Sequence, residues 1–173
     1  REEFDGSAWA RIARSHLGGL PPEVDLKAEV ALGNVVRALS AADGPDGRPL
    51  VRAAHDLSNG GLVQSLVDSA LRFGIGGVFD VAGAARRDSV GDHEMLLSES
   101  QARAFVAVPE AAVKAVFAAA EAEGVDAIRI GTTGGDMLAI SGVDLLAAEG
   151  EGCGWIASID ELRELSDTGR KYF

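Results

Sequence analysis

Two short polar segments of this chain carry residue types that could bind a phosphate group or a sugar. In the first, residues 54–62, a short β-type run leads into a polar turn with Gly60 and Gly61, and then into an amphipathic helix. Backbone N–H groups at such a helix start, next to glycines without side chains, can donate to an anion such as phosphate. A loop of this kind is by itself a weak signal.

His55, Asp56 and Ser58 add side-chain chemistry to this first segment. One interpretation is functional: Asp56 orients the loop or a bound cation, and His55 donates to an anion. The alternative is structural, with Asp56 capping the glycine turn through backbone N–H groups and His55 satisfied in the core. The turn as a whole could contact phosphate or a neighbouring domain.

The second segment is Ser98, Glu99, Ser100 and Gln101, between the apolar runs 95–97 and 104–106. We expect these four residues to interrupt a strand edge and to expose two hydroxyls, a carboxylate and an amide together. Hydroxyls suit phosphate oxygens, whereas a carboxylate suits a sugar hydroxyl or a metal. The alternative is an ordinary polar turn with Glu99 in solvent.

The remaining candidates carry weaker signals. His93 is predicted to lie in a surface loop and His16 on an amphipathic helix, since no metal-ligand spacing accompanies either. Cys153, the only cysteine, excludes an internal disulfide and a multi-cysteine metal site, and no histidine partner is evident for it. The glycine-rich residues 131–135 lack the Lys-Ser/Thr of a P-loop and predict a turn.

The elements that position these segments follow from periodicity and turn signals. Helices are predicted at 4–17, at 25–41 with Asp25 as N-cap, at 62–73, from 109 onward, and at 158–165 with Ser158 and Glu161 in a capping box. Strands are predicted at 50–54, 77–81, 104–108, 127–130 and 137–140, the last two as a hairpin across 131–136. In the second helix Leu26, Val30, Val36 and Leu39 are expected on one side. The predicted fold class is α/β (α+β), a mixed β-sheet with helices packed against it.

Length and composition limit the class of protein. The 173 residues suit a single domain over 1–173, with a lead-in helix and linker at 1–24 and a domain core at 25–165. The start at Arg1, without a methionine, indicates a fragment of a longer chain. The formal net charge of −11 argues against nucleic-acid binding. No membrane span or signal peptide is evident, which predicts a soluble, cytoplasmic protein.

Three motifs occur in a recognisable order: residues 55–62 (HDLSNGGL), 96–103 (LLSESQAR) and 130–135 (IGTTGG). Together with Gly6-Ser7 and residues 21–29, they resemble the C-terminal part of the PurL family, the synthetase components of phosphoribosylformylglycinamidine synthases. The resemblance covers residues 4–142 and does not extend to residues 166–173. It implies the fold of the C-terminal domain of aminoimidazole ribonucleotide synthetase, and of the two such domains in PurL this chain resembles the second.

The resemblance implies a step of purine biosynthesis. The family converts formylglycinamide ribonucleotide, ATP and ammonia into formylglycinamidine ribonucleotide, ADP and phosphate. It implies ATP and magnesium held mainly by domains absent from this chain, with no cofactor expected on the fragment and no catalytic residue in it. The implied partners are the remaining PurL domains, a glutaminase (PurQ) that supplies ammonia, and PurS where the synthetase is of the small form.

The same resemblance limits the roles of the two segments. The family's substrate phosphate is held by a Glu-Ser-Gln run in the first C-terminal-type domain. Residues 99–101 match that run in the other domain, so they could hold phosphate, belong to a vestigial nucleotide site, or keep the loop's shape. The family commonly has an acidic residue where Asn59 stands, so no charged role is carried over to it. Two alternatives stay open: another synthetase of the superfamily, for aminoimidazole ribonucleotide or selenophosphate, and a docking domain for a glutaminase.

Overall fold

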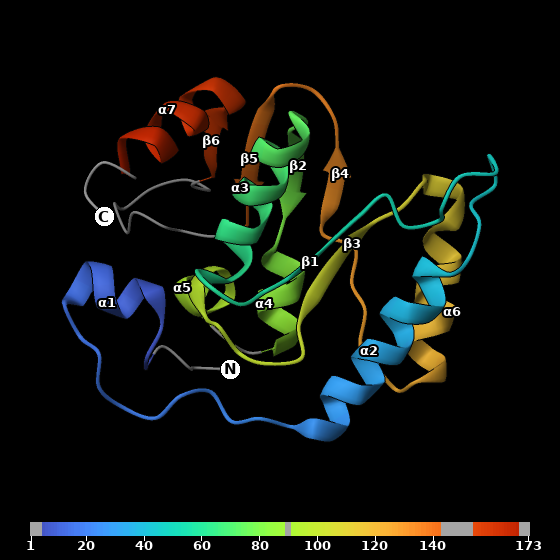
Figure 1. Cartoon of the computed structure of the whole chain (residues 1–173), viewed down its shortest axis with the longest axis horizontal. Coiled ribbons are helices and arrows are strands. Elements are labelled where there is room, and N and C mark those ends of the chain that lie inside the picture. Colours follow the sequence, from blue (N-terminus) through green and yellow to red (C-terminus); the bar gives the residue numbers. More distant parts are fainter. Residues whose placement is uncertain (1–4, 89–90, 143–153, 170–173) are drawn as a thin grey trace. The chain divides into compact units, whose positions relative to one another are not determined.

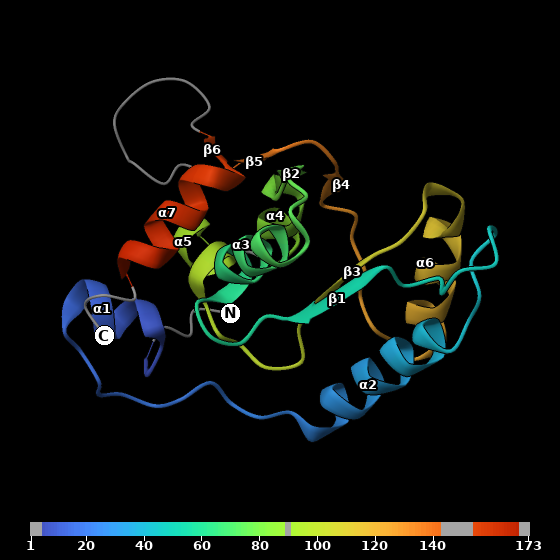
Figure 2. The same cartoon turned by 45° about the horizontal axis from the view of Figure 1, so that its top comes forward.

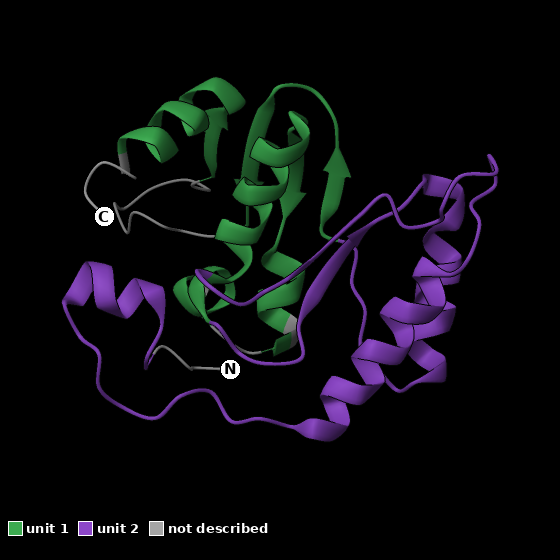
Figure 3. Cartoon of the chain, viewed as in Figure 1, with its two compact units in different colours: residues 1–2, 61–98, 130–173 green, residues 3–60, 99–129 purple. Residues whose placement is uncertain are grey.

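The computed structural model describes residues 5–88, 91–142 and 154–169, which fall into two compact units (Figure 3). Unit 1 contains residues 1–2, 61–98 and 130–173, and unit 2 contains residues 3–60 and 99–129. Each unit is therefore built from stretches that are separate in the sequence. The prediction of a single domain with a lead-in at 1–24 stays a prediction.

Unit 2 combines a two-stranded antiparallel ribbon with helices. Its elements are α1 (Ala8–Arg14), α2 (Leu26–Ser40), β1 (Ala53–Asp56), β3 (Ala104–Ala107), the 3-10 turn η1 (Glu110–Ala112) and α6 (Val113–Ala122). β1 pairs with β3, and α2 packs against α6 (Figure 1). The core of this unit is aliphatic, as the low aromatic content suggests, and contains Val35, Leu39, Leu50 and Ala112.

The start of α2 is set by local hydrogen bonding. The carboxylate of Asp25 accepts the N–H groups of Lys27 and Ala28, both at 3.0 Å, which confirms the predicted N-cap. The residues predicted to lie on one side of this helix differ in burial, because Leu26 is 73% exposed and Val30 is 64% exposed, whereas Leu39 is buried.

Unit 1 is a four-stranded mixed sheet with helices. Its elements are α3 (Gly61–Phe73), β2 (Gly77–Asp80), α4 (Ala82–Asp88), α5 (Asp92–Leu97), β4 (Gly131–Thr133), β5 (Met137–Ser141), β6 (Trp155–Ser158) and α7 (Ile159–Gly169). The strand order is β4-β2-β5-β6, with β2 parallel to β5 and the other pairs antiparallel. Figures 1 and 2 show α3 and α7 next to each other, and their residues are in contact. The predicted α/β class is confirmed.

The pleat of this sheet separates a buried face from an exposed one. Phe79, Leu138, Ile140 and Ala157 are buried on one face, whereas Val78 and Ile156 on the other are each 63% exposed. The sequence alternation in β5, Met137 exposed and Leu138 buried, follows this pattern.

The hairpin predicted across 131–136 is wrong. The first of its strands lies later than predicted, at Gly131–Thr133, and it does not pair with β5. β2 lies between the two strands instead and pairs with both. Gly131 permits this pairing, because a Cβ there would stand 2.1 Å from the carbonyl oxygen of Val78. The short connection 134–136 therefore crosses the end of β2, which lies between β4 and β5. The turn residues alone do not indicate this crossing.

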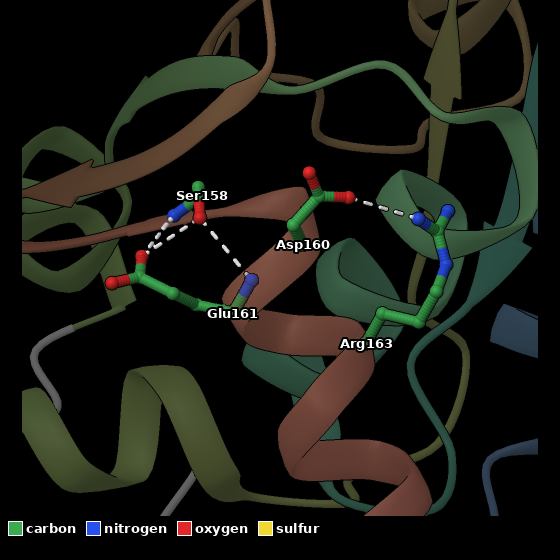
Figure 4. Close-up of polar contacts among 4 residues, drawn as sticks. All are labelled: Ser158, Asp160, Glu161 and Arg163. Carbon is green, nitrogen blue, oxygen red and sulfur yellow. Dashed lines mark hydrogen bonds and ion pairs between the residues drawn. The ribbon is translucent and has the colours of Figure 1, made fainter.

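The last helix begins at the predicted capping box, drawn in Figure 4. Ser158 Oγ accepts the N–H of Glu161 at 3.2 Å, and Glu161 Oε2 accepts the N–H of Ser158 at 2.8 Å. Helix α7 ends at Gly169, beyond the predicted end at Leu165, and the strand β6 before it is not predicted. The first helix is shorter than predicted: α1 covers only Ala8–Arg14, since Ser15 turns left-handed with φ +50°.

Candidate functional site

His55 and Asp56 are the last two residues of β1, which begins three residues later and ends two residues later than the strand predicted at 50–54. They pair with β3, His55 opposite Phe105 and Asp56 opposite Ala104. Burial alternates along β1, so that the His55 side chain is half-buried and that of Asp56 is exposed. The ribbon thus holds two adjacent polar groups on opposite faces at the start of the glycine turn.

The His55 ring is fixed by two contacts. It stacks on Phe105 with ring centroids 6.0 Å apart and an angle of 23° between the planes. Its Nδ1 lies 2.7 Å from the carbonyl oxygen of Asp56. A carbonyl only accepts, so this hydrogen bond requires the proton on Nδ1 and leaves Nε2 as the acceptor of a neutral ring. The geometry supports the structural interpretation of His55 as a histidine satisfied by the protein itself.

Asp56 is held in its charged form by its surroundings. A hydrogen bond from the Ser58 hydroxyl lowers the pKa of the Asp56 carboxyl most, with smaller lowering from its own backbone N–H and from His55 and a partial offset from desolvation. His55 Nδ1 lies 3.3 Å from Asp56 Oδ1. Ser58 and Asn59 are exposed, so the turn presents a carboxylate and a hydroxyl to solvent.

The second candidate segment meets the glycine turn through Glu99, within unit 2. Glu99 Oε1 accepts the N–H of Gly60 at 2.8 Å and also the N–H of Ala8 at 2.8 Å. Both distances are typical of hydrogen bonds to a carboxylate. Glu99 is only partly exposed, so the alternative of an ordinary turn with this side chain in solvent is wrong.

Gly60 and Gly61 both adopt positive φ, at +75° and +67°, as glycine permits. Within unit 1, Gly61 is buried against the end of α5. A Cβ at this position would stand 2.6 Å from the carbonyl oxygen of Leu96 and 2.8 Å from that of Ser98. Position 61 therefore requires glycine both for its backbone conformation and for the space it occupies.

The serines of the second segment are buried, contrary to the expectation that their hydroxyls are exposed. Ser98 is 0% exposed and Ser100 is 3% exposed, while Gln101 is exposed. The apolar run before the segment is a helix, α5, rather than a strand, and Ser98 is its C-cap, with its N–H bonded to the carbonyl of Glu94. The segment therefore begins at the C-terminal end of helix α5 in unit 1, and the expectation that it interrupts a strand edge is wrong.

Ser100 is the exception among the buried polar groups that the structure describes, because its Oγ has no hydrogen-bond partner. An unpaired buried hydroxyl is costly and therefore uncommon in folded proteins. Two residues later, Ala102 has φ +55°, which a residue with a Cβ seldom adopts. Its N–H donates to Glu29 Oε1 on α2 at 2.7 Å, and this bond holds the strained backbone in place.

The structure thus brings some of the predicted residues together. Glu99 and Gly60 are bonded, and His55 and Asp56 lead directly into the same turn. Gly61 and Ser98 approach each other within unit 1. Sequence analysis missed Ala8, Glu29 and Ala102, because contacts across 91 and 73 residues leave no local signal.

The other candidates stay apart from these segments or outside the described residues. His93 is exposed on α5, and His16 follows α1 with its ring 4.0 Å from Asp5. Cys153 lies outside the described residues. Within residues 5–88, 91–142 and 154–169, no group of three His, Cys, Asp or Glu side chains is arranged to hold a metal ion. In the same ranges, no helix has the length and apolar character needed to cross a membrane.

Comparison with known proteins gives consistent results. Residues 2–141 match the model of the family described as AIR synthase related protein, C-terminal domain. The chain is 44% identical over 142 residues to phosphoribosylformylglycinamidine synthase subunit PurL of Nocardioides sp., which covers 82% of this chain and 17% of that protein. It is 41% identical over 174 residues to the PurL of Renibacterium salmoninarum, covering 100% of this chain and 21% of that one.

Solved structures show the same fold. The PurLQS structure from Thermotoga maritima matches with a TM-score of 0.63 at 15% identity, over 91% of this chain and 24% of that one. T. maritima PurL complexed with ATP matches with a TM-score of 0.52 at 16% identity, over 65% of this chain and 19% of that one. The chain spans about a fifth of the length of the curated relatives to which it is similar.

Proposed function

Because this chain belongs to the AIR synthase related protein C-terminal domain family, we propose that it acts as the C-terminal domain of a PurL-type synthetase. The observation that carries the proposal is the identity of 41–45% to PurL subunits over 77–100% of the chain. The longer protein would convert formylglycinamide ribonucleotide, ATP and ammonia into formylglycinamidine ribonucleotide, ADP and phosphate, as an ATP-dependent ligase of purine biosynthesis. Its place would be the cytoplasm.

We assign ATP and magnesium to other domains of that protein. Among the described residues no arrangement of carboxylates and histidines fits a metal ion. A solved relative of the same fold is PurL complexed with ATP, and this chain corresponds to 19% of it. ATP would supply the phosphoryl group that activates the amide oxygen of the substrate, with magnesium as its counter-ion.

The two polar segments would form part of one wall of a ligand cavity in the longer protein. The support is their contact through Gly60 and Glu99, together with the buried hydroxyl of Ser100, which has no partner among the described residues. Ser100 would donate to a phosphate oxygen, and Gln101 would offer its amide. His55, Asp56 and Ser58 would contribute at the rim.

A docking role is the second candidate function. It is favoured by the bond between Glu99 and Gly60, because groups that satisfy each other need no ligand. The partners would be the remaining domains of the longer protein, a glutaminase of the PurQ type, and PurS where the synthetase is of the small form. One solved structure of the same fold is a PurLQS complex.

A chimera tests the proposed function. The matching 142 residues of the Nocardioides PurL are replaced by those of this chain. The formation of formylglycinamidine ribonucleotide from formylglycinamide ribonucleotide, ATP and ammonia is then measured. We expect substantial turnover, because the domain would restore the same packing and the same cavity wall. A second chimera with Leu138→Asp, which places a charge in the core of unit 1, is the inactive control. A folded, correctly assembled chimera without activity would contradict the proposal.

Measuring glutamine-dependent activity in the same chimera separates the two roles. If ammonia supports turnover and glutamine with PurQ and PurS does not, the domain serves the synthetase but fails to dock the glutaminase. If both support turnover, the docking surface is preserved as well.

A further inference from the structure

One polar contact of the candidate site joins three distant segments of the chain. A single carboxylate oxygen, Glu99 Oε1, receives two backbone N–H groups, those of Ala8 and Gly60, each at 2.8 Å. The two donors come from segments that are 91 and 39 residues away in the sequence. All three residues belong to unit 2, so the arrangement does not depend on the placement of the two units.

Backbone N–H groups that converge on one position form a site for an anion. Here both bonds are part-buried, and a part-buried N–H without a partner is costly. Glu99 satisfies both donors and supplies the negative charge as well. A phosphate oxygen would need the same N–H groups from the same direction, so carboxylate and phosphate are alternatives at this position.

We propose that the Glu99 side chain is the built-in anion of an oxyanion site formed by Ala8 and Gly60, and that it keeps phosphates and carboxylates out. Removal of this side chain opens the site to inorganic phosphate or to small carboxylates. The proposal concerns the N–H of Gly60 and not the hydroxyl of Ser100, so its failure would leave the proposed function standing.

The charges of the same unit agree with an internal occupant. Asp56 precedes the glycine turn with its carboxyl pKa lowered by Ser58, and the Glu29 carboxylate bonds Ala102 three residues after Glu99. At the position of the Glu99 carboxylate itself, these neighbouring carboxylates would repel a dianionic phosphate more strongly than they repel the singly charged Glu99 side chain.

The test uses Glu99→Ala in the 173-residue chain, with inorganic phosphate and acetate as probes. Removing the carboxylate leaves two N–H groups without a partner, so we expect the Tm to fall by roughly 5 °C. Phosphate or acetate should recover part of this loss, and chloride at equal ionic strength should not. In backbone NMR spectra, the Gly60 and Ala8 amide signals of the variant should shift and saturate with phosphate, whereas those of the wild type should not move.

The matched control is Glu121→Ala, which removes an exposed carboxylate from α6 in the same unit. It carries the same change in net charge and should show neither the loss of Tm nor the recovery. Saturable phosphate shifts at Gly60 in the wild type would overturn the proposal, as would a folded Glu99→Ala chain whose Gly60 and Ala8 amides ignore both probes.

A second variant keeps the proposal testable if Glu99→Ala does not fold. Glu99→Gln retains an acceptor oxygen but has no charge, so the two hydrogen bonds should persist in weaker form. We expect the amide proton signals of Ala8 and Gly60 to move upfield together relative to the wild type. Unchanged signals at both positions would show that Glu99 is not their acceptor and would overturn the proposal.

Discussion

Asp56 lies next to the glycine turn in an exposed position, and the Ser58 hydroxyl is the main reason that its pKa is lowered. The pair forms a small local motif, a carboxylate with a hydroxyl two residues later, that shapes the entry to the turn. Such a motif keeps the carboxylate charged over a wider pH range and limits the conformations of residues 57–59. Its contribution is therefore to the order of the loop.

We predict that Ser58→Ala raises the pKa of Asp56 toward its ordinary value, because the largest lowering cause is removed. The folded pKa of Asp56 is below its unfolded value, so its contribution to stability is present above the unfolded pKa and lost as pH falls through the folded one. Carboxyl-carbon NMR titration measures the pKa of Asp56 in the wild type and in Ser58→Ala. Asn59→Ala, in the same turn, is the control. An unchanged Asp56 titration in Ser58→Ala would contradict the assignment.

Among single residues, sequence reasoning is most successful where chemistry is local. The caps at Asp25 and at Ser158 with Glu161 were predictable because donor and acceptor lie within three residues. The bond between Glu29 and Ala102 was not, since nothing in a helix stretch indicates which distant N–H it meets.

Helix α7 illustrates how an element is fixed at its start. Its capping box pairs Ser158 and Glu161 reciprocally, and the backbone N–H of Ser158, followed by its hydroxyl, lowers the pKa of the Glu161 carboxyl (Figure 4). The same helix packs against α3, with Leu162 buried and Leu165 exposed. The cap thus fixes the first residue of the helix, and with it the position of the buried side chains Ile159 and Leu162.

We predict that Ser158→Ala destabilises the chain by about 1 kcal/mol at neutral pH, the usual effect of losing an N-cap hydroxyl. Ser158→Thr, which keeps an acceptor oxygen, should lose much less. Since the folded pKa of Glu161 is lowered, its share of the cap is lost as pH falls through that pKa. The difference between the two variants should then shrink to what the hydroxyl contributes as acceptor of the Glu161 N–H. Urea unfolding at neutral and at acidic pH measures the free energy of unfolding of the wild type and of both variants. Equal stability of both variants at neutral pH would refute it.

Most elements were predictable in type, and the errors came from pairing and burial between distant residues. The strand at Gly131–Thr133 was predicted a few residues too early and as one arm of a hairpin, because glycines and a polar turn precede β5. The insertion of β2 between the two depends on contacts with residues 77–80, which no local pattern encodes. Likewise, Ser98 and Ser100 look exposed by residue type but are buried, and Ser98 is the C-cap of α5.

For the molecule as a whole, the chain by itself should not catalyse the proposed reaction. It spans about a fifth of the relatives that it resembles, and its described residues offer no metal site. We predict no ADP release above background when the chain is mixed with ATP, magnesium, ammonia and formylglycinamide ribonucleotide. Full-length Nocardioides PurL, assayed in parallel, is the positive control. Substrate-dependent ADP release by the 173 residues alone would refute the assignment of catalysis to other domains.

The division of the described chain into two units has a consequence for how this architecture can be cut or inherited. The backbone passes from one unit to the other after Gly60, after Ser98 and after Arg129. A protease that nicks any one of these crossings leaves the halves tethered by the remaining two. Since each unit consists of separate stretches of sequence, no single continuous segment of the chain contains either described unit without residues of the other.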